Sequence, residues 1–237
     1  MSYLNTKPLV YAFEQGAMEQ EIELLFDYPA KVAAMLLADQ VDVGLIPVAM
    51  IPGLSESHII SDFGIGASQP VASVCLFSEV PVSDIKEILV DYQSRTSAAL
   101  LRILLKKFWK IDPVLTDTKD GYQENIKGTT AGLVIGDRAL KQRAHSTYIY
   151  DLAEAWRALT GLPFLFAAWV ANKKLPASFI AAFNQATAEG LQHLPEIVAA
   201  NPFPEYDLFH YYSENIDYIL DEQKREALGL FLQYLHE

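Results

Sequence analysis

The stretch EILVDYQSRTSAALLRILLKKFW, residues 87–109, decides the fold class of this chain. Its first five residues, EILVD, form a short apolar run that is typical of a buried strand. Residues 94–109 then place apolar side chains at helical spacing. Because a strand that turns directly into an amphipathic helix is the repeating unit of α/β proteins, this stretch predicts an α/β fold.

Strands and helices also alternate on both sides of this stretch. Before it, we expect a strand at 21–26 (EIELLF), a helix at 29–40 and a strand at 42–48, which together predict a parallel sheet. Strand-like runs follow at 58–65 and 70–78. After it, the pattern predicts further strands at 131–137 and 146–151 and a helix that Gly161 ends, and from about residue 176 it predicts long helices only.

The order of these elements predicts two lobes with a ligand cleft between them. The chain is expected to cross between the lobes near 75–80 and again near 163–172. The expected lobe 1 is discontinuous, comprising residues 1–76 and 171–237, and the expected lobe 2 comprises residues 77–170. Clefts between lobes are preferred sites for small ligands.

Composition excludes several classes of function. A formal net charge of −12 argues against a nucleic-acid partner, and Cys75 as the only cysteine excludes an internal disulfide. The five histidines are scattered, so no metal site is expected, and no phosphate-binding or nucleotide-binding glycine motif is present. The longest apolar stretch, 162–171, is too short to span a membrane. We therefore expect a cytoplasmic protein, whose oligomeric state the sequence does not define.

Three turns place polar residues at a helix start: SYLNT (2–6), DYQSRTS (91–97) and IGD (135–137). The amino end of a helix attracts anions, so all three are candidates to line one cleft. The ordinary explanation is helix capping, by Asn5 or Thr6 in the first turn and by Asp137 in the third. For Asp137, the cap is the favoured interpretation over a catalytic carboxylate.

Capping explains the second turn less well. Ser94, Thr96 and Ser97 supply three hydroxyl groups where a cap requires one, and Arg95 lies among them. An arginine that donates two parallel hydrogen bonds suits a carboxylate ligand. The alternative, that Arg95 simply points into solvent, stays open.

Several segments in register resemble the chorismate dehydratase family of the futalosine route to menaquinone (MqnA). They are SYLNTKPLVYAFE, DVGLIPVAMI, VCLFSEVPVSDIKEILVDYQSRTSAALLRILL, AGLVIGDRAL and DLAEAWRALTGLPFLFAAWVA, all within residues 2–172. The resemblance implies a type II periplasmic-binding-protein fold used as an enzyme, a small dicarboxylate substrate, no cofactor, and the loss of water from chorismate. It points to Asn5 as catalytic and, with the IGD turn, to a substrate-binding set: Ser2, Tyr3, Leu4, Thr6, Ser94, Arg95, Thr96, Ser97, Gly136 and Asp137.

One departure from the family pattern concerns the start of the chain. Members of the family have a further strand before SYLNT, whereas here only Met1 precedes Ser2. Either the start is truncated, which we favour, or a strand is lost and the sheet of the first lobe has a gap. Two other functions remain open: a binding protein without chemistry, and the sister dihydroxynaphthoate synthase of the same pathway.

Overall fold

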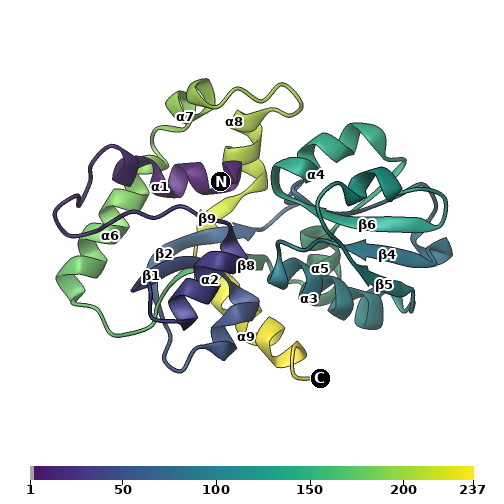
Figure 1. The fold of residues 1–237 in the computed structure, drawn as a ribbon, viewed down its shortest axis with the longest axis horizontal. Coiled ribbons are helices and arrows are strands. Elements are labelled where there is room, and N and C mark those ends of the chain that lie inside the picture. Colours follow the sequence, from purple (N-terminus) through teal and green to yellow (C-terminus); the bar gives the residue numbers. More distant parts are fainter. Residues whose placement is uncertain (1–2) are drawn as a thin grey trace.

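The computed structural model describes residues 3–237 and arranges them in two lobes, each built on its own sheet (Figure 1). The first lobe has the strand order β1-β8-β2-β9, and the second has the order β5-β4-β6-β3-β7. This arrangement confirms the predicted two-lobed α/β class. The strands are β1 Val43–Pro47, β2 His58–Ala67, β3 Val74–Ser78, β4 Glu87–Val90, β5 Val114–Asp117, β6 Thr130–Ile135, β7 Tyr148–Asp151, β8 Phe164–Ala171 and β9 Asp217–Ile219.

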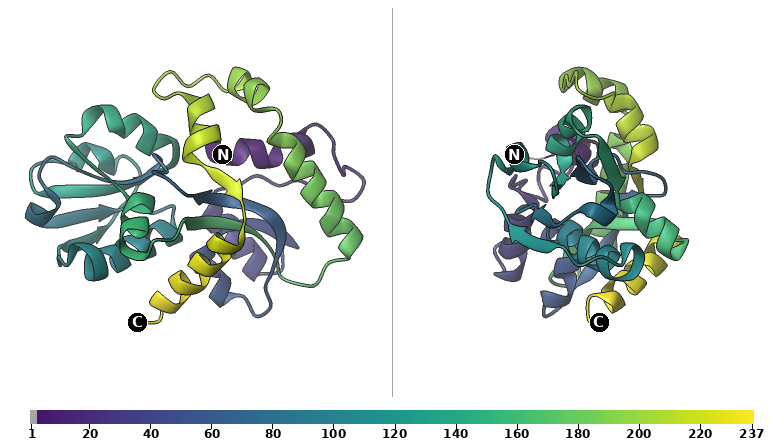
Figure 2. Two further views of the ribbon diagram at one scale, coloured as in Figure 1. Left: turned by 180° about the vertical axis from the view of Figure 1, so that it is seen from behind. Right: turned by 90° about the vertical axis from the view of Figure 1, so that its right-hand side faces the viewer.

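Helices pack around both sheets, as the views in Figure 2 show. In the second lobe they are α3 Arg95–Leu104, α4 Gly136–Gln142 and α5 Leu152–Thr160. The chain then returns to the first lobe, where α6 packs on α1 through the rings of Phe13 and Phe183, which are tilted by 33° with their centroids 4.9 Å apart. The helices of the first lobe are α1 Lys7–Glu14, α2 Pro29–Leu37, α6 Ala177–Gly190, α7 Leu194–Ala200, α8 Leu208–His210 and α9 Glu222–Tyr234.

The chain passes between the lobes at two connections. Residues 68–73 join β2 to β3, and residues 161–163 join α5 to β8. Next to the second connection, the buried Trp156 donates from Nε1 to the carbonyl of Pro163 (3.0 Å) and packs edge-on against Phe164 and Phe231. The exact limits of the lobes remain a prediction, and these two connections are where we propose to place them.

The prediction of a parallel sheet is wrong for the first lobe. All of its strand pairs are antiparallel, because β1 and β2 both pair with β8, which arrives from the other end of the chain. Parallel pairing occurs in the second lobe, where β4 lies between β5 and β6. There, β3 pairs antiparallel with β6 and β7, so the second sheet is mixed.

Residues 21–26 do not form the expected strand. The segment is irregular and lies across a cavity of about 480 Å³ from the edge of β1. The backbone N–H groups of residues 23–26 have no hydrogen-bond partner among the described residues. An alternating sequence becomes a strand only when a neighbour pairs with it, and here no described strand does. Apolar side chains of this segment therefore remain exposed to solvent, with Leu25 51% and Phe26 46% exposed.

Among residues 3–237, no helix combines the length and the apolarity that crossing a bilayer requires.

Candidate functional site

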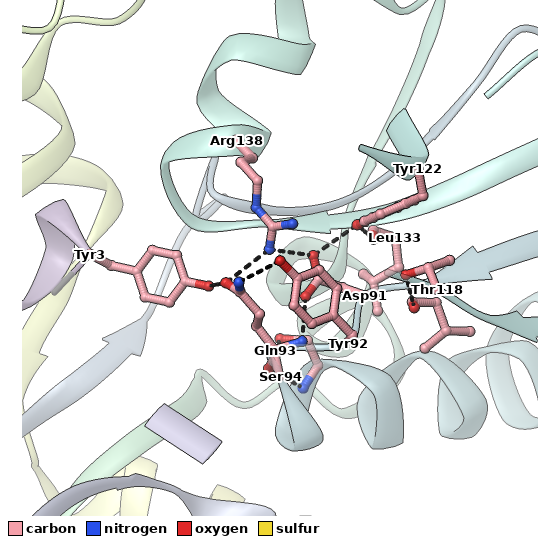
Figure 3. Close-up of polar contacts among 11 residues, drawn as sticks. Tyr3, Asp91, Tyr92, Gln93, Ser94, Thr118, Tyr122, Leu133 and Arg138 are labelled. Atoms are coloured by element: carbon pink, nitrogen blue, oxygen red, sulfur yellow. Dashed lines mark hydrogen bonds and ion pairs between the residues drawn. The ribbon is translucent and has the colours of Figure 1, made fainter. Parts of the chain in front are cut away.

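Three hydrogen bonds join the two lobes along what we call the interlobe seam. The backbone N–H of Leu4 donates to Asp137 Oδ1 (3.1 Å), and the N–H of Ala49 donates to Thr96 Oγ1 (3.2 Å). The Tyr3 hydroxyl donates to Gln93 Oε1, and Figure 3 shows its ring reaching across toward Gln93. The seam therefore gathers segments from all three turns that the sequence marked as candidates.

The first turn does not cap its helix in the expected way. Leu4–Thr6 form a 3-10 turn before α1, and neither Asn5 nor Thr6 makes a side-chain cap bond. The Thr6 hydroxyl instead donates to the carbonyl of Tyr3 (2.6 Å). Asn5 accepts at its backbone carbonyl from the Tyr218 hydroxyl (3.1 Å), while its side-chain Oδ1 is buried without a partner. The side chain of Asn5 thus does not serve the helix, and it lies beside the Tyr211 hydroxyl, whose pKa burial raises and Asn5 lowers in part.

In the second turn, each of the three hydroxyl groups has a partner within the protein. Ser94 caps α3 by accepting from the N–H of Ser97 (3.0 Å), and its own hydroxyl donates to Ser97 Oγ (2.8 Å). Thr96 accepts from the first lobe, as described above. Arg95 is exposed and makes no polar contact with any described side chain. The apparent surplus of hydroxyls is therefore accounted for by capping and by contact between the lobes.

The third turn corrects the expectation that Asp137 is a helix cap. The cap position of α4 is Ile135, and Asp137 lies within the first turn with its carboxylate directed to Leu4 of the other lobe. Burial raises the pKa of Asp137, and the Leu4 N–H lowers this pKa in part. Gly136, at φ +62°, permits the close approach of Tyr3, since a Cβ there would lie 2.4 Å from a carbon of the tyrosine ring.

The charged centre of the seam, Arg138 with Asp91, was not predicted from the sequence. Arg138 Nη2 lies 2.8 Å from Asp91 Oδ2 and donates to Gln93 Oε1 (3.1 Å). Burial raises the pKa of Asp91, while Arg138 lowers it in part. Burial also raises the pKa of Tyr3 to about 12. Asp91 is the first residue of the DYQSRTS turn and Arg138 follows the IGD turn, but no local pattern paired them.

Buried polar atoms without partners concentrate near the seam. Among residues 3–237, five buried side-chain N or O atoms lack a hydrogen-bond partner, and three of them are Asn5 Oδ1, Arg138 Nη1 and the Tyr212 hydroxyl. Burial raises the pKa of the Tyr212 hydroxyl, and the nearby Asp137 carboxylate raises it further. Buried polar groups are nearly always paired, so unpaired ones gathered in one place indicate a site for a polar ligand or water.

The structure thus brings together most of the residues predicted for the site. The seam contains Tyr3, Leu4, Asn5, Thr96, Gly136 and Asp137, with Ser94 and Ser97 beside Gln93; Thr6 bonds back to Tyr3, and Arg95 is exposed. Ser2 lies outside the described residues. No group of three or more His, Cys, Asp or Glu side chains suited to a metal ion is found in the part of the chain that the structure describes.

Comparison with solved structures identifies proteins that share this fold. Protein AF1704 from Archaeoglobus fulgidus matches with a TM-score of 0.79 at 13% identity, covering 99% of this chain and 94% of that one. The aliphatic sulphonate binding protein SsuA from Escherichia coli matches with a TM-score of 0.57 at 16% identity, covering 97% and 89%. The fold is therefore that of the periplasmic binding proteins.

Comparison of sequences gives the family. A chorismate dehydratase from Thermus thermophilus is 26% identical over 260 aligned residues, which cover 98% of this chain and 92% of the relative. The family model described as menaquinone biosynthesis, VitK2_biosynth, matches residues 1–237. The chain that forms this seam is therefore a member of the menaquinone biosynthesis family.

Proposed function

We propose that this chain is a chorismate dehydratase, which eliminates water from chorismate to give 3-[(1-carboxyvinyl)oxy]benzoate. The observation that carries the proposal is the group of buried, unpaired polar atoms at the seam of a chain that the menaquinone biosynthesis family matches from end to end. The relative named chorismate dehydratase supports the same reaction.

The chemistry asks little of the protein beyond placement of the substrate. The C3–H bond of the ring breaks, its electron pair becomes part of the aromatic ring, and the C4 hydroxyl leaves with a proton as water. Because the product is aromatic, the thermodynamic drive comes from the substrate. The protein then contributes mainly orientation and charge stabilisation.

The seam supplies groups for both tasks. Negative charge develops on the ring carboxylate as the C3 proton leaves, and the backbone N–H groups of the first turn of α3, beside its cap Ser94, would stabilise it. Asn5 would accept from the C4 hydroxyl at its unpaired Oδ1, or donate from Nδ2 to the enolpyruvyl group. We assign the base to the side-chain carboxylate of the substrate itself.

The test is to incubate the purified protein with chorismate and to follow the aromatic product by ultraviolet absorbance and chromatography. Asn5→Ala and Ser94→Ala are each expected to lower turnover. If both variants turned over chorismate at the rate of the unaltered protein, the assignment of these residues would be wrong.

A binding protein without chemistry is the second candidate, since the fold is shared with the aliphatic sulphonate binding protein SsuA. Such a protein would return chorismate unchanged after prolonged incubation, so the same experiment separates the two functions. Both functions require the lobes to close on the ligand. Small-angle scattering is therefore expected to show compaction when product is added.

A further inference from the structure

Arg138 is a charged residue of the seam with N–H donors that no described residue accepts from. Its Nη2 is occupied by Asp91 and Gln93, whereas its Nη1 is buried and has no partner among the described residues. The side chain as a whole is 24% exposed, whereas Nη1 itself is shielded from water. A guanidinium group with one nitrogen free in such a position has two N–H donors to offer to an acceptor.

The guanidinium group is held in place from two sides. Asp91, whose side chain is fully buried, accepts from Arg138 and also from the Tyr122 hydroxyl (2.8 Å) and the N–H of Gln93 (2.8 Å). The ring of Tyr92 lies 5.3 Å from the guanidinium carbon, within the range of a cation–π contact. Figure 3 shows these groups surrounding the side chain. Little rotamer freedom is left for a ligand to remove, which favours binding.

The identity of the missing partner follows from charge and geometry. An arginine side chain donates to oxygen acceptors, and a carboxylate is the acceptor whose two oxygens match its planar donors. Asp91 and Gln93 contact only Nη2, so the ion pair leaves the donors of Nη1 without an acceptor. Resting on the function proposed above, we propose that Arg138 binds the ring carboxylate of the substrate through Nη1 and so selects for carboxylate ligands.

This assignment differs from the one that the sequence suggests. Arg95 carries the same group in the SRTS segment, but it is exposed, and no described side chain forms a polar contact that would orient it. Arg138 is connected through Gln93 to the start of α3, where the proposed donors to the ring carboxylate lie. A ligand carboxylate placed there would contact both the guanidinium group and the helix start.

The test measures binding separately from turnover. Isophthalate, an aromatic dicarboxylate that cannot react, is titrated into the protein by calorimetry beside benzamide, which lacks a carboxylate. Arg138→Gln is expected to weaken isophthalate binding by about 10- to 100-fold, the range for a hydrogen bond to a charged group. Arg138→Lys should fall between, because lysine keeps the charge but loses the planar donors. Arg102→Gln, which removes an exposed arginine of α3, is the matched control and should bind as the unaltered protein does.

Folding is controlled by a second variant, because Arg138→Gln leaves Asp91 buried without its cation. Asp91→Asn combined with Arg138→Gln removes both charges and should show the same loss of isophthalate binding in a folded protein. Binding by both Arg138 variants equal to that of the Arg102 control would overturn the proposal. So would a failure of the unaltered protein to bind isophthalate better than benzamide. A third outcome separates the two proposals. If the Arg138 variants lose isophthalate binding but the unaltered protein does not turn over chorismate, Arg138 is a carboxylate site and only the dehydratase function is refuted.

Discussion

Replacing Gly136 by alanine is expected to disturb the seam through its contact with Tyr3. The added Cβ would lie 2.4 and 2.5 Å from two carbons of the tyrosine ring, far inside van der Waals contact. The backbone at φ +62° adds a second cost, because an L-residue in the left-handed region loses about 1–2 kcal/mol. Overpacking adds about 1–3 kcal/mol, so the free energy of unfolding should fall by about 2–5 kcal/mol.

Gly161 provides a control that separates the two costs. Its φ is +78°, and no atom lies within 4 Å of the position that a Cβ would take. Gly161→Ala therefore carries the backbone cost alone. In a chain of this size, about 1–2 kcal/mol corresponds to a decrease of about 2–8 °C in the melting temperature. Gly136→Ala should lower the melting temperature further than Gly161→Ala does.

A double variant then identifies the ring as the cause. Adding Tyr3→Ala to Gly136→Ala removes the clash, so the melting temperature should rise toward that of Gly161→Ala. Added to Gly161→Ala, the same substitution should have its ordinary effect only. Thermal unfolding followed by circular dichroism measures all five proteins, the parent included. Equal losses for the two glycine variants, together with no coupling between Tyr3 and Gly136, would refute the close contact at the seam.

Three further predictions concern other parts of the molecule. Burial holds the folded-state pKa of Asp137 above its ordinary value of 3.8, so its contribution to stability is present at low pH and is lost as the pH rises through the raised value. As the pH rises from about 4 to 7, the melting temperature of Asp137→Asn should therefore increase relative to that of the unaltered protein. A difference between the two proteins that does not change with pH would contradict this. Lys224 is fully buried, so Lys224→Ala, which leaves a cavity, should lower the free energy of unfolding in urea by about 2–5 kcal/mol. Lys224→Met keeps the volume and should cost clearly less, and equal losses would contradict this. Backbone amides of residues 23–26 should exchange with deuterium much faster than those of β8, and strong protection would show that they are paired.

Local pattern was sufficient where an element is stabilised by its own residues. The helix expected after Ser94 is present, capped by that residue, and Gly161 ends α5 in the left-handed conformation that favours glycine. These features depend on neighbours within one turn of the chain. For the same reason, the second-lobe helices agree with their apolar spacing.

Pattern failed where the deciding partner is distant in the sequence. Residues 21–26 alternate like a strand but find no strand to pair with, and β1 is antiparallel because its neighbour β8 is more than 100 residues away. The short strands β5 and β9 were missed because four and three residues carry too little periodicity. Register and direction of pairing are properties of the assembled sheet.

The candidate site likewise has features that local sequence predicts and features that depend on distant residues. Three turns with polar residues were recognisable, and the structure brings parts of all three to one seam. The pairing of Arg138 with Asp91 was not recognisable, because 47 residues separate them and each residue type alone is common at a helix start or a strand end. A capping residue and a ligand-binding residue look alike in sequence, and only the unpaired buried atoms distinguish them.

The strength of the seam determines how a substrate would enter. The bonds Leu4–Asp137, Ala49–Thr96 and Tyr3–Gln93 are each worth about 0.5–1.5 kcal/mol net, so the seam contributes about 1.5–4.5 kcal/mol to the contact between the lobes. A ligand with two carboxylates offers charge-assisted bonds of about 1.5–3 kcal/mol each, enough to replace them. The seam bonds can therefore be exchanged for bonds to a ligand, and a carboxylate at Arg138 would favour closure of the lobes. Because Tyr3 donates to the same Gln93 oxygen that Arg138 contacts, entry of the ligand is expected to be coupled to movement of the tyrosine ring.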